Sequence, residues 1–295
     1  MGYGQHQSFY LRINWLRKAL KHLQEGKVFN KVEAPEQLGL GKNMVQSLRY
    51  WVEATEVVRI EKATLHISDF GQLLNRYDRF IELRDTASII HLHLTDNKEP
   101  STTWYWYFNH CIRKVATKEE LLTDLISWIA QNDVKKPSES SLKRDIDCLV
   151  RLYCDKERPE DPEEVIQSPL NILGLVAEEN KNVIKRSPRY SDIGTGALLY
   201  SLLRYKAVHG ISVLSVDEIE KKESLWGKVY NLQRNEIIKA LEELTVHPYH
   251  KIRFDRTNRL DTIHLPDVSA MRFLEDEYKR NGRKTYVDSN SIFTS

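Results

Sequence analysis

The chain has 295 residues, of which 41% are hydrophobic and 29% are charged, and its formal net charge is only +2. This composition excludes intrinsic disorder and leaves room for two or three small domains. No window reaches the roughly 18 consecutive apolar residues of a membrane span. The three cysteines form no Cys-x-x-Cys pair, which argues against a zinc finger or a disulfide framework. We therefore expect a cytoplasmic protein without a membrane segment.

Residues 34–71 show the pattern of a winged helix-turn-helix. A short helix begins near Pro35 and stops at Gly39, a second helix follows, and two short β-rich runs close the unit. The second helix of this module usually enters a DNA groove. Its polar side chains are expected to face bases or phosphates: Lys42, Asn43, Gln46, Ser47 and Arg49. Nine Lys or Arg against five Glu in residues 1–59 suit that role, although such modules also dock proteins.

Residues 77–94 are apolar at helical spacing and predict one continuous helix. Asp78, Glu82 and Asp85 are spaced by four and three residues, so one helix face would carry all three carboxylates. Such a group around Mg²⁺ or Mn²⁺ would serve a metal-dependent nickase. Arginines interleave with these acids, so a salt-bridged helix surface is the simpler interpretation. No His or Cys spacing typical of a metal site accompanies them.

A second helix-turn-helix-like pattern follows a run of five aromatic residues at 104–108. The run would either stack on unpaired bases or, as we favour, pack into the core. An amphipathic helix at 119–130 precedes a turn and a helix that reaches about Tyr153. Lys143 and Arg144 stand at the outward entry of that helix and are candidate phosphate contacts, with acidic residues close by in the sequence.

The last third of the chain repeats the order of helices followed by a hairpin. Helices are expected near 196–209, 215–222 and 231–244, followed by a basic hairpin. Arg256 would lie near the hairpin tip together with Arg259, where a wing can reach DNA.

The predicted fold class is mainly α with small β-hairpins as wings, in two or three winged helix-turn-helix-like units. Residues 1–76 would form a winged-helix DNA-binding domain, and residues 77–154 a helical middle domain. An acidic linker or loop at 155–169 would lead to a C-terminal winged-helix-like domain at 170–280. Residues 281–295 would form a tail.

Five stretches of the chain resemble the bacterial family known as domain of unknown function family 4007. They are residues 9–19, 38–51, 104–109, 142–149 and 168–175. Members of that family are similar to the B component of the Ssp system, which replaces a non-bridging phosphate oxygen of DNA with sulfur and takes part in anti-phage defence. The resemblance implies a DNA-binding component, with a strand-nicking activity attributed to it.

The same resemblance implies partners. These are DNA and the proteins that handle sulfur: a cysteine desulfurase, an ATPase and an ATP-pyrophosphatase-like protein. We also expect a homodimer. No cofactor is predicted apart from Mg²⁺ or Mn²⁺ for a nickase. The alternative function is a non-catalytic scaffold or a winged-helix transcription regulator.

Overall fold

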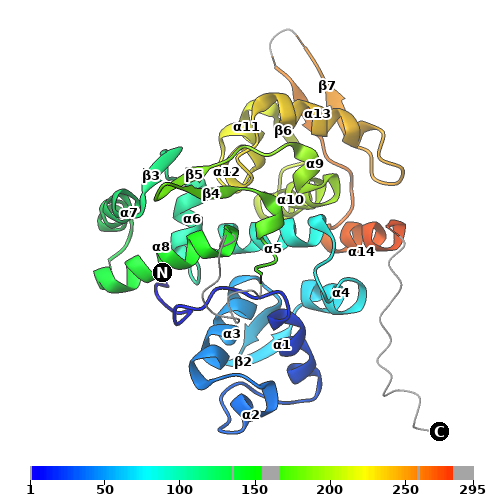
Figure 1. Ribbon diagram of the computed structural model, residues 1–295. Helices are drawn as coiled ribbons and strands as arrows, with labels where there is room; N and C mark the ends of the chain where they lie inside the picture. Colours follow the sequence, from blue (N-terminus) through cyan, green and yellow to red (C-terminus); the bar gives the residue numbers. More distant parts are fainter. Residues whose placement is uncertain (1, 135, 155–166, 258–259, 282–295) are drawn as a thin grey trace, which may run out of the picture.

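The protein is mainly helical, as the sequence predicted, and its described residues form three small antiparallel sheets (Figure 1). The computed structural model describes residues 2–134, 136–154, 167–257 and 260–281. The predicted linker and tail therefore lie outside the described residues, except for their short ends. Within the described ranges, no helix combines the length and the apolar character needed to cross a membrane.

The first group of elements is helical and ends in a hairpin. It comprises α1 (Trp15–Gln24), α2 (Ala34–Leu38), α3 (Lys42–Ala54), β1 (Val58–Glu61) and β2 (Thr64–Ile67). Pro35 stands in the first turn of α2, where its missing N–H costs no hydrogen bond. Gly39 ends α2 in the left-handed conformation, with a φ of 61°, which a residue without a Cβ adopts at little cost. The turn from α2 to α3 is thus fixed locally by the sequence.

The second group adds a third strand to the same kind of order. It comprises α6 (Thr102–Asn109), β3 (Val115–Thr117), α7 (Lys118–Asn132), α8 (Glu139–Tyr153), β4 (Val176–Glu179) and β5 (Asn182–Lys185). The sheet order is β3-β5-β4, and both pairs are antiparallel. A reciprocal cap between Thr117 and Glu120 starts α7. β4 and β5 follow the predicted linker, and β5 pairs with β3, a strand of the predicted middle domain.

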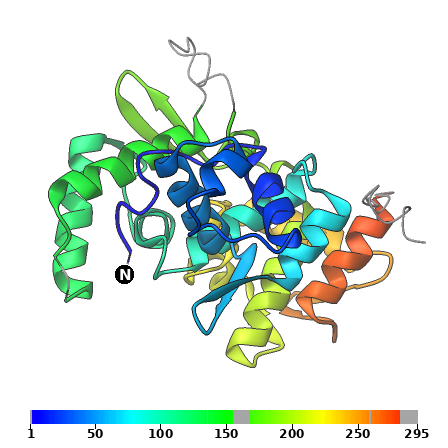
Figure 2. The ribbon, with the colours of Figure 1, turned by 90° about the horizontal axis from the view of Figure 1, so that it is seen from below.

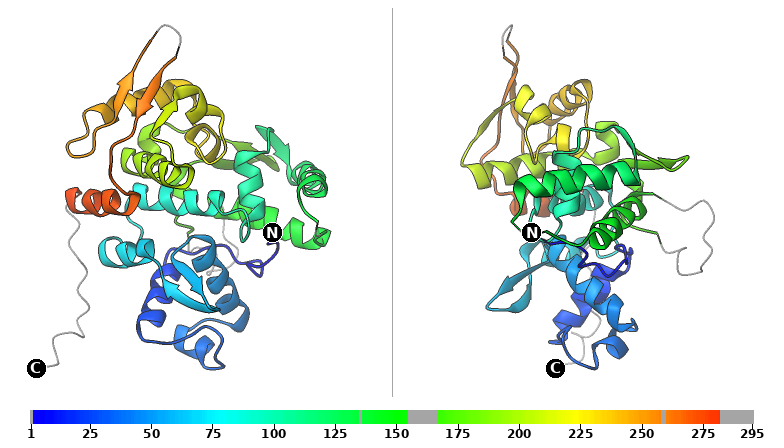
Figure 3. Two further views of the ribbon diagram at one scale, coloured as in Figure 1. Left: turned by 180° about the vertical axis from the view of Figure 1, so that it is seen from behind. Right: turned by 90° about the vertical axis from the view of Figure 1, so that its left-hand side faces the viewer.

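The third group repeats this arrangement. It comprises α10 (Thr195–His209), β6 (Val213–Ser215), α11 (Val216–Lys221), α12 (Trp226–Val229), α13 (Arg234–Thr245), β7 (Arg253–Asp255) and β8 (Thr262–His264). Its sheet order, β6-β8-β7, corresponds strand for strand to that of the second group. The β7–β8 hairpin projects at the end of the molecule opposite the first group (Figure 3). Short elements join the groups: η2 (Asn171–Leu173) and α9 (Tyr190–Ile193).

The central helix α5 (Arg84–Asp96) connects the three groups. It is buried from Thr86 to Thr95, and its two histidines bond to different neighbours. His91 lies between the Tyr153 hydroxyl at 2.6 Å and the Val229 carbonyl at 2.8 Å. His93 lies between the Thr55 carbonyl at 3.0 Å and the Tyr200 hydroxyl at 2.9 Å. Figure 2 shows the first group, in blue, on the near side of this core.

The prediction of one continuous helix over residues 77–94 is wrong for the part before Arg84. Six residues, 78–83, separate the end of α4 (Asp69–Tyr77) from the start of α5. The Asp78 carboxylate accepts hydrogen bonds from the backbone N–H groups of Glu82 and Leu83, at 2.9 and 3.0 Å. This local cap competes with helix propagation and turns the chain. The last helix, α14 (Ala270–Arg280), contacts both α4 and α10.

The aromatic run is part of the core. Trp104, Tyr105, Trp106, Tyr107 and Phe108 are each at most 9% exposed. Trp104 packs edge-on against Trp51 of α3, with ring centroids 5.6 Å apart. These rings are therefore not available to stack on bases.

Candidate nucleic-acid interface

The start of α3 presents polar side chains to solvent, as its sequence predicted. Lys42, Asn43 and Gln46 are exposed, and Lys42 has no ion-pair partner within the described ranges. Arg49 is half-buried, because its guanidinium binds Asn30 Oδ1 at 2.7 Å and Glu53 at 3.2 Å. Lys42 is thus the cation on this helix that a phosphate could bind without displacing an acid.

Ser47 does not belong to this outward face. Its side chain is fully buried, and its hydroxyl donates to the Phe9 carbonyl at 3.3 Å. The prediction failed because the N-terminal segment covers the side of α3 that a lone helix-turn-helix would leave open. Ser47 therefore joins α3 to the N-terminal segment.

A pocket of about 410 Å³ lies beside the exposed face of α3. It combines apolar and basic side chains from the α1–α2 connection with α3 itself. Its lining consists of Phe29, Asn30, Lys31, Val32, Pro35, Lys42, Val45, Gln46 and Arg49. Three of these residues are cations and none is an acid, so the hollow has the polarity that a phosphate group requires.

The outward face of α8 is more basic than the sequence suggested. Lys143 and Arg144 are exposed, and neither forms an ion pair among the described residues. The two nearby acids do not oppose them, because Asp145 is buried and Asp147 binds Lys118 at 3.4 Å.

Sequence reasoning missed two further cations beside these. Arg151 lies two helical turns beyond Lys143, is exposed, and has no acidic partner in the described part of the chain. Lys136, in the turn before α8, is likewise exposed. The spacing of eight residues between Lys143 and Arg151 was the signal that could have revealed the longer basic face.

The basic hairpin of the third group differs from these two surfaces. Arg253 binds Asp255 at 3.0 Å, and Arg256 binds Glu242 of α13 at 2.9 Å. Arg259 lies outside the described residues. Arg253 and Arg256 therefore have acidic partners already, and a phosphate would have to compete with them.

The three candidate catalytic carboxylates do not form one site. Asp78 caps its own turn, and Glu82 is exposed in the α4–α5 connection. Asp85 accepts the Ala197 N–H at 2.7 Å, at the start of α10. Burial, together with the nearby Glu277, raises the Asp85 pKa to about 6. A Cβ on Gly194, which has a φ of 97°, would clash with this carboxylate.

The described residues also offer no cradle for a divalent ion. Nowhere among them do three or more His, Cys, Asp or Glu side chains gather at metal-binding distance. The buried His91 and His93 use both ring nitrogens in hydrogen bonds within the core. A Mg²⁺ or Mn²⁺ site built from the predicted carboxylates is thus not supported by their placement.

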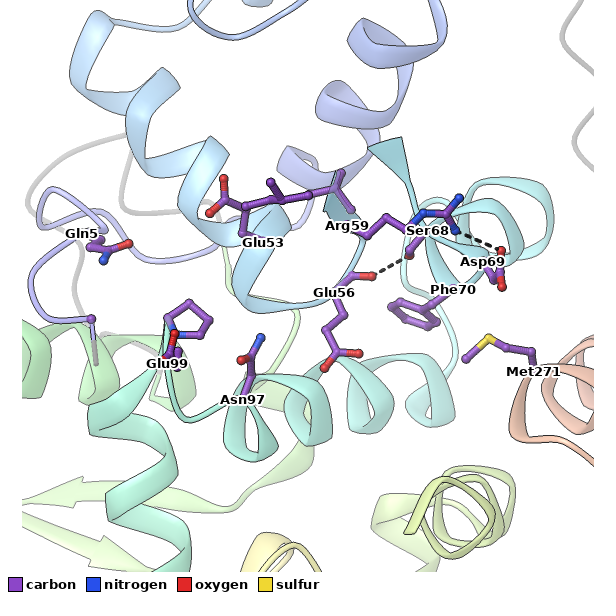
Figure 4. A pocket seen from close by; sticks show the side chains of 14 residues that line it. Gln5, Glu53, Glu56, Arg59, Ser68, Asp69, Phe70, Asn97, Glu99 and Met271 are labelled. Atoms are coloured by element: carbon purple, nitrogen blue, oxygen red, sulfur yellow. Dashed lines mark hydrogen bonds and ion pairs between the residues drawn. The ribbon is translucent and has the colours of Figure 1, made fainter. Parts of the chain in front are cut away.

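A second hollow, of about 860 Å³, has the wrong charge for a phosphate (Figure 4). It lies between the end of α3, the β1–β2 hairpin and the connection after α5. Glu53, Glu56, Asp69 and Glu99 line it against the single cation Arg59. Four carboxylates to one guanidinium would repel a nucleic-acid backbone.

The sequence of this chain matches a known family, and its fold matches solved structures. Residues 3–278 match the family model described as a protein of unknown function, DUF4007. The chain belongs to this family.

Two solved structures have a similar fold. A crystal structure of magnesium-bound SspB superposes with a TM-score of 0.84 at 20% identity, covering 94% of this chain and 88% of that one. A second SspB crystal structure gives 0.83 at 19% identity, covering 96% and 88%. A search of curated protein sequences found no match. At this level of identity the likeness concerns the fold.

Proposed function

We propose that this protein binds duplex DNA through α3 and α8, as the DNA-engaging component of a phosphorothioation system related to that of SspB. The observation that carries the proposal is the distribution of free cations. Lys42 on α3, and Lys143, Arg144 and Arg151 on α8, are exposed without acidic partners among the described residues, whereas Arg253 and Arg256 on the third group are paired. Free surface cations release counterions from DNA at the lowest cost.

The element order supports a winged-helix assignment for these groups. In the second and third groups, a helix, a strand, two helices of a helix-turn-helix and two hairpin strands follow in sequence, apart from the added α12. The first strand joins the sheet beside the last in both groups. The first group has the helix-turn-helix and hairpin without that first strand. In such units α3 and α8 occupy the place of the recognition helix.

The similarity of fold to SspB supports the biological setting. In that setting the partners would be DNA and the sulfur-handling proteins named above. The third group, whose hairpin arginines are paired with acids, suits contact with such proteins better than contact with DNA. We assign no nicking centre, because Asp78 and Asp85 are bonded to separate backbone segments.

The proposal is tested by the salt dependence of DNA binding. Fluorescence anisotropy with a short random-sequence duplex, between about 50 and 200 mM salt, gives the slope of log affinity against log salt. Lys42→Ala should lower the affinity and flatten the slope by up to about one unit, and Lys143→Ala with Arg144→Ala should do so by up to about two units. The matched control, Arg253→Ala with Arg256→Ala, should leave the slope unchanged. Wild-type slopes in both the Lys42 variant and the Lys143–Arg144 variant would overturn the proposal.

A further inference from the structure

The N-terminal segment joins the two candidate recognition helices through one backbone atom. The Phe9 carbonyl oxygen accepts hydrogen bonds from Ser47 Oγ at 3.3 Å and Trp51 Nε1 at 3.0 Å, both on α3. The thiol of Cys148, on α8, approaches the same oxygen at 3.8 Å. Both helices therefore turn a buried face toward this segment.

A second contact fixes the segment to α8. Asp145 accepts the Gly4 N–H at 2.8 Å and the His6 Nε2–H at 2.8 Å on one carboxylate oxygen. Its other oxygen accepts the Thr103 hydroxyl at 2.9 Å. The His6 and Asp145 side chains are only 1% and 2% exposed. His6 Nδ1 accepts the Ser8 N–H at 3.2 Å, which leaves Nε2 to carry the proton toward Asp145.

The exposed edges of both helices border the same segment. On α3, Tyr50 packs against His6 with ring centroids 6.1 Å apart, and Tyr50 lies one helical turn after the exposed Gln46. On α8, a Cβ placed on Gly4 would come within 3.4 Å of the Arg144 guanidinium. Tyr50, one helical turn from Gln46, and Arg144 therefore both lie beside residues 4–9.

We propose that residues 4–9 hold α3 and α8 in the one relative orientation that lets both helices contact the same duplex. This inference rests on the proposed DNA-binding function. Each helix that contacts a duplex displaces counterions from it. The two contributions add up on one duplex only when both helices can contact it at the same time. His6 and Asp145 are positioning residues in this arrangement, and they touch no DNA themselves.

The test is whether the salt slope falls when the segment is released without removing any Lys or Arg. In the full-length protein, His6→Ala should lower the slope by the share of one helix, up to about two units. Asp145→Asn keeps the shape of the side chain but places an amide NH₂, which cannot accept the Thr103 hydrogen bond, where the carboxylate oxygen was. It should also lower the slope. It serves as the second variant if His6→Ala does not fold, as judged by circular dichroism.

Combining the variants sharpens the test. If His6→Ala uncouples α8 from the duplex, then adding Lys143→Ala and Arg144→Ala should change the slope little further. Tyr3→Phe, which removes a bond to Asp133 from the residue just before this segment, should keep the wild-type slope. Tyr230→Phe, which removes a buried bond to Ser88, controls for lowered stability and should also keep it.

The outcomes separate this inference from the function on which it rests. Wild-type slopes for His6→Ala and Asp145→Asn, together with reduced slopes for the Lys and Arg variants, would overturn the positioning role and leave DNA binding in place. Wild-type slopes for the Lys and Arg variants as well would overturn the proposed function itself.

Discussion

Replacement of His91 by Leu should weaken the core of the protein and change how its stability depends on pH. The His91 ring is fully buried and bonds to the Tyr153 hydroxyl and the Val229 carbonyl. Leu would leave two buried polar groups without a partner, at a cost of about 1–3 kcal/mol each at neutral pH. Because α5 packs against α6 of the second group and α10 of the third, and bonds through His93 to Thr55 at the end of α3, we expect the loss to appear in unfolding of the whole protein.

The pH dependence follows from the lowered pKa of His91. Burial lowers this pKa from 6.5 to about 4, so the folded state keeps the ring neutral while the unfolded chain binds a proton below pH 6.5. The stability that the neutral ring contributes is therefore present above pH 6.5 and is lost as the pH falls toward 4. Between about pH 7.5 and about pH 5 this loss amounts to about 2 kcal/mol.

Urea unfolding followed by tryptophan fluorescence at these two pH values measures the effect. The stability gap between the wild type and His91→Leu should narrow by about 2 kcal/mol at the lower pH. His66→Leu, at an exposed position on β2, serves as the control and should show no such narrowing. A gap of equal size at both pH values would refute the account of His91 as a buried neutral ring.

Other substitutions test the placement of the candidate site residues. Ser47→Ala should lower the free energy of unfolding by about 1 kcal/mol in urea titrations and leave DNA affinity unchanged, because the hydroxyl faces Phe9. A loss of DNA affinity without a loss of stability would contradict this placement and indicate that Ser47 contacts DNA. Asp85 has a pKa raised to about 6, so it costs stability as the pH rises from 3.8 through 6. Asp85→Asn should remove that cost, about 3 kcal/mol at most, in thermal unfolding above pH 7. If the pH dependence of stability were the same in Asp85→Asn as in the wild type, the raised pKa of Asp85 would be contradicted.

Local signals in the sequence were sufficient to predict the turn between α2 and α3. Pro35 in the first turn of α2 and Gly39 at its end act through the backbone of a few neighbouring residues, so the sequence predicts the α2–α3 turn correctly. The same reasoning failed at Asp78, where a side chain capped the backbone and interrupted an apolar pattern that looked continuous.

Long-range contacts were beyond what periodicity could show. Ser47 was expected to face outward because its helix was considered alone, and residues distant in the sequence cover it. Asp145 is one of the acidic residues close to Lys143 and Arg144 in the sequence, yet it is buried against His6 and does not share their exposed face. In both cases the deciding partner lies in the N-terminal segment, which has no helical or strand pattern that would place it there.

A quadruple variant tests the proposal that α3 and α8 bind DNA through unpaired cations. Lys42, Lys143, Arg144 and Arg151 would all be replaced by Ala, and binding to a short random-sequence duplex would be measured by anisotropy across a salt series. The account predicts a large loss of affinity and a slope flatter by up to about four units, with an unchanged circular dichroism spectrum. Wild-type affinity and slope in a folded quadruple variant would contradict it.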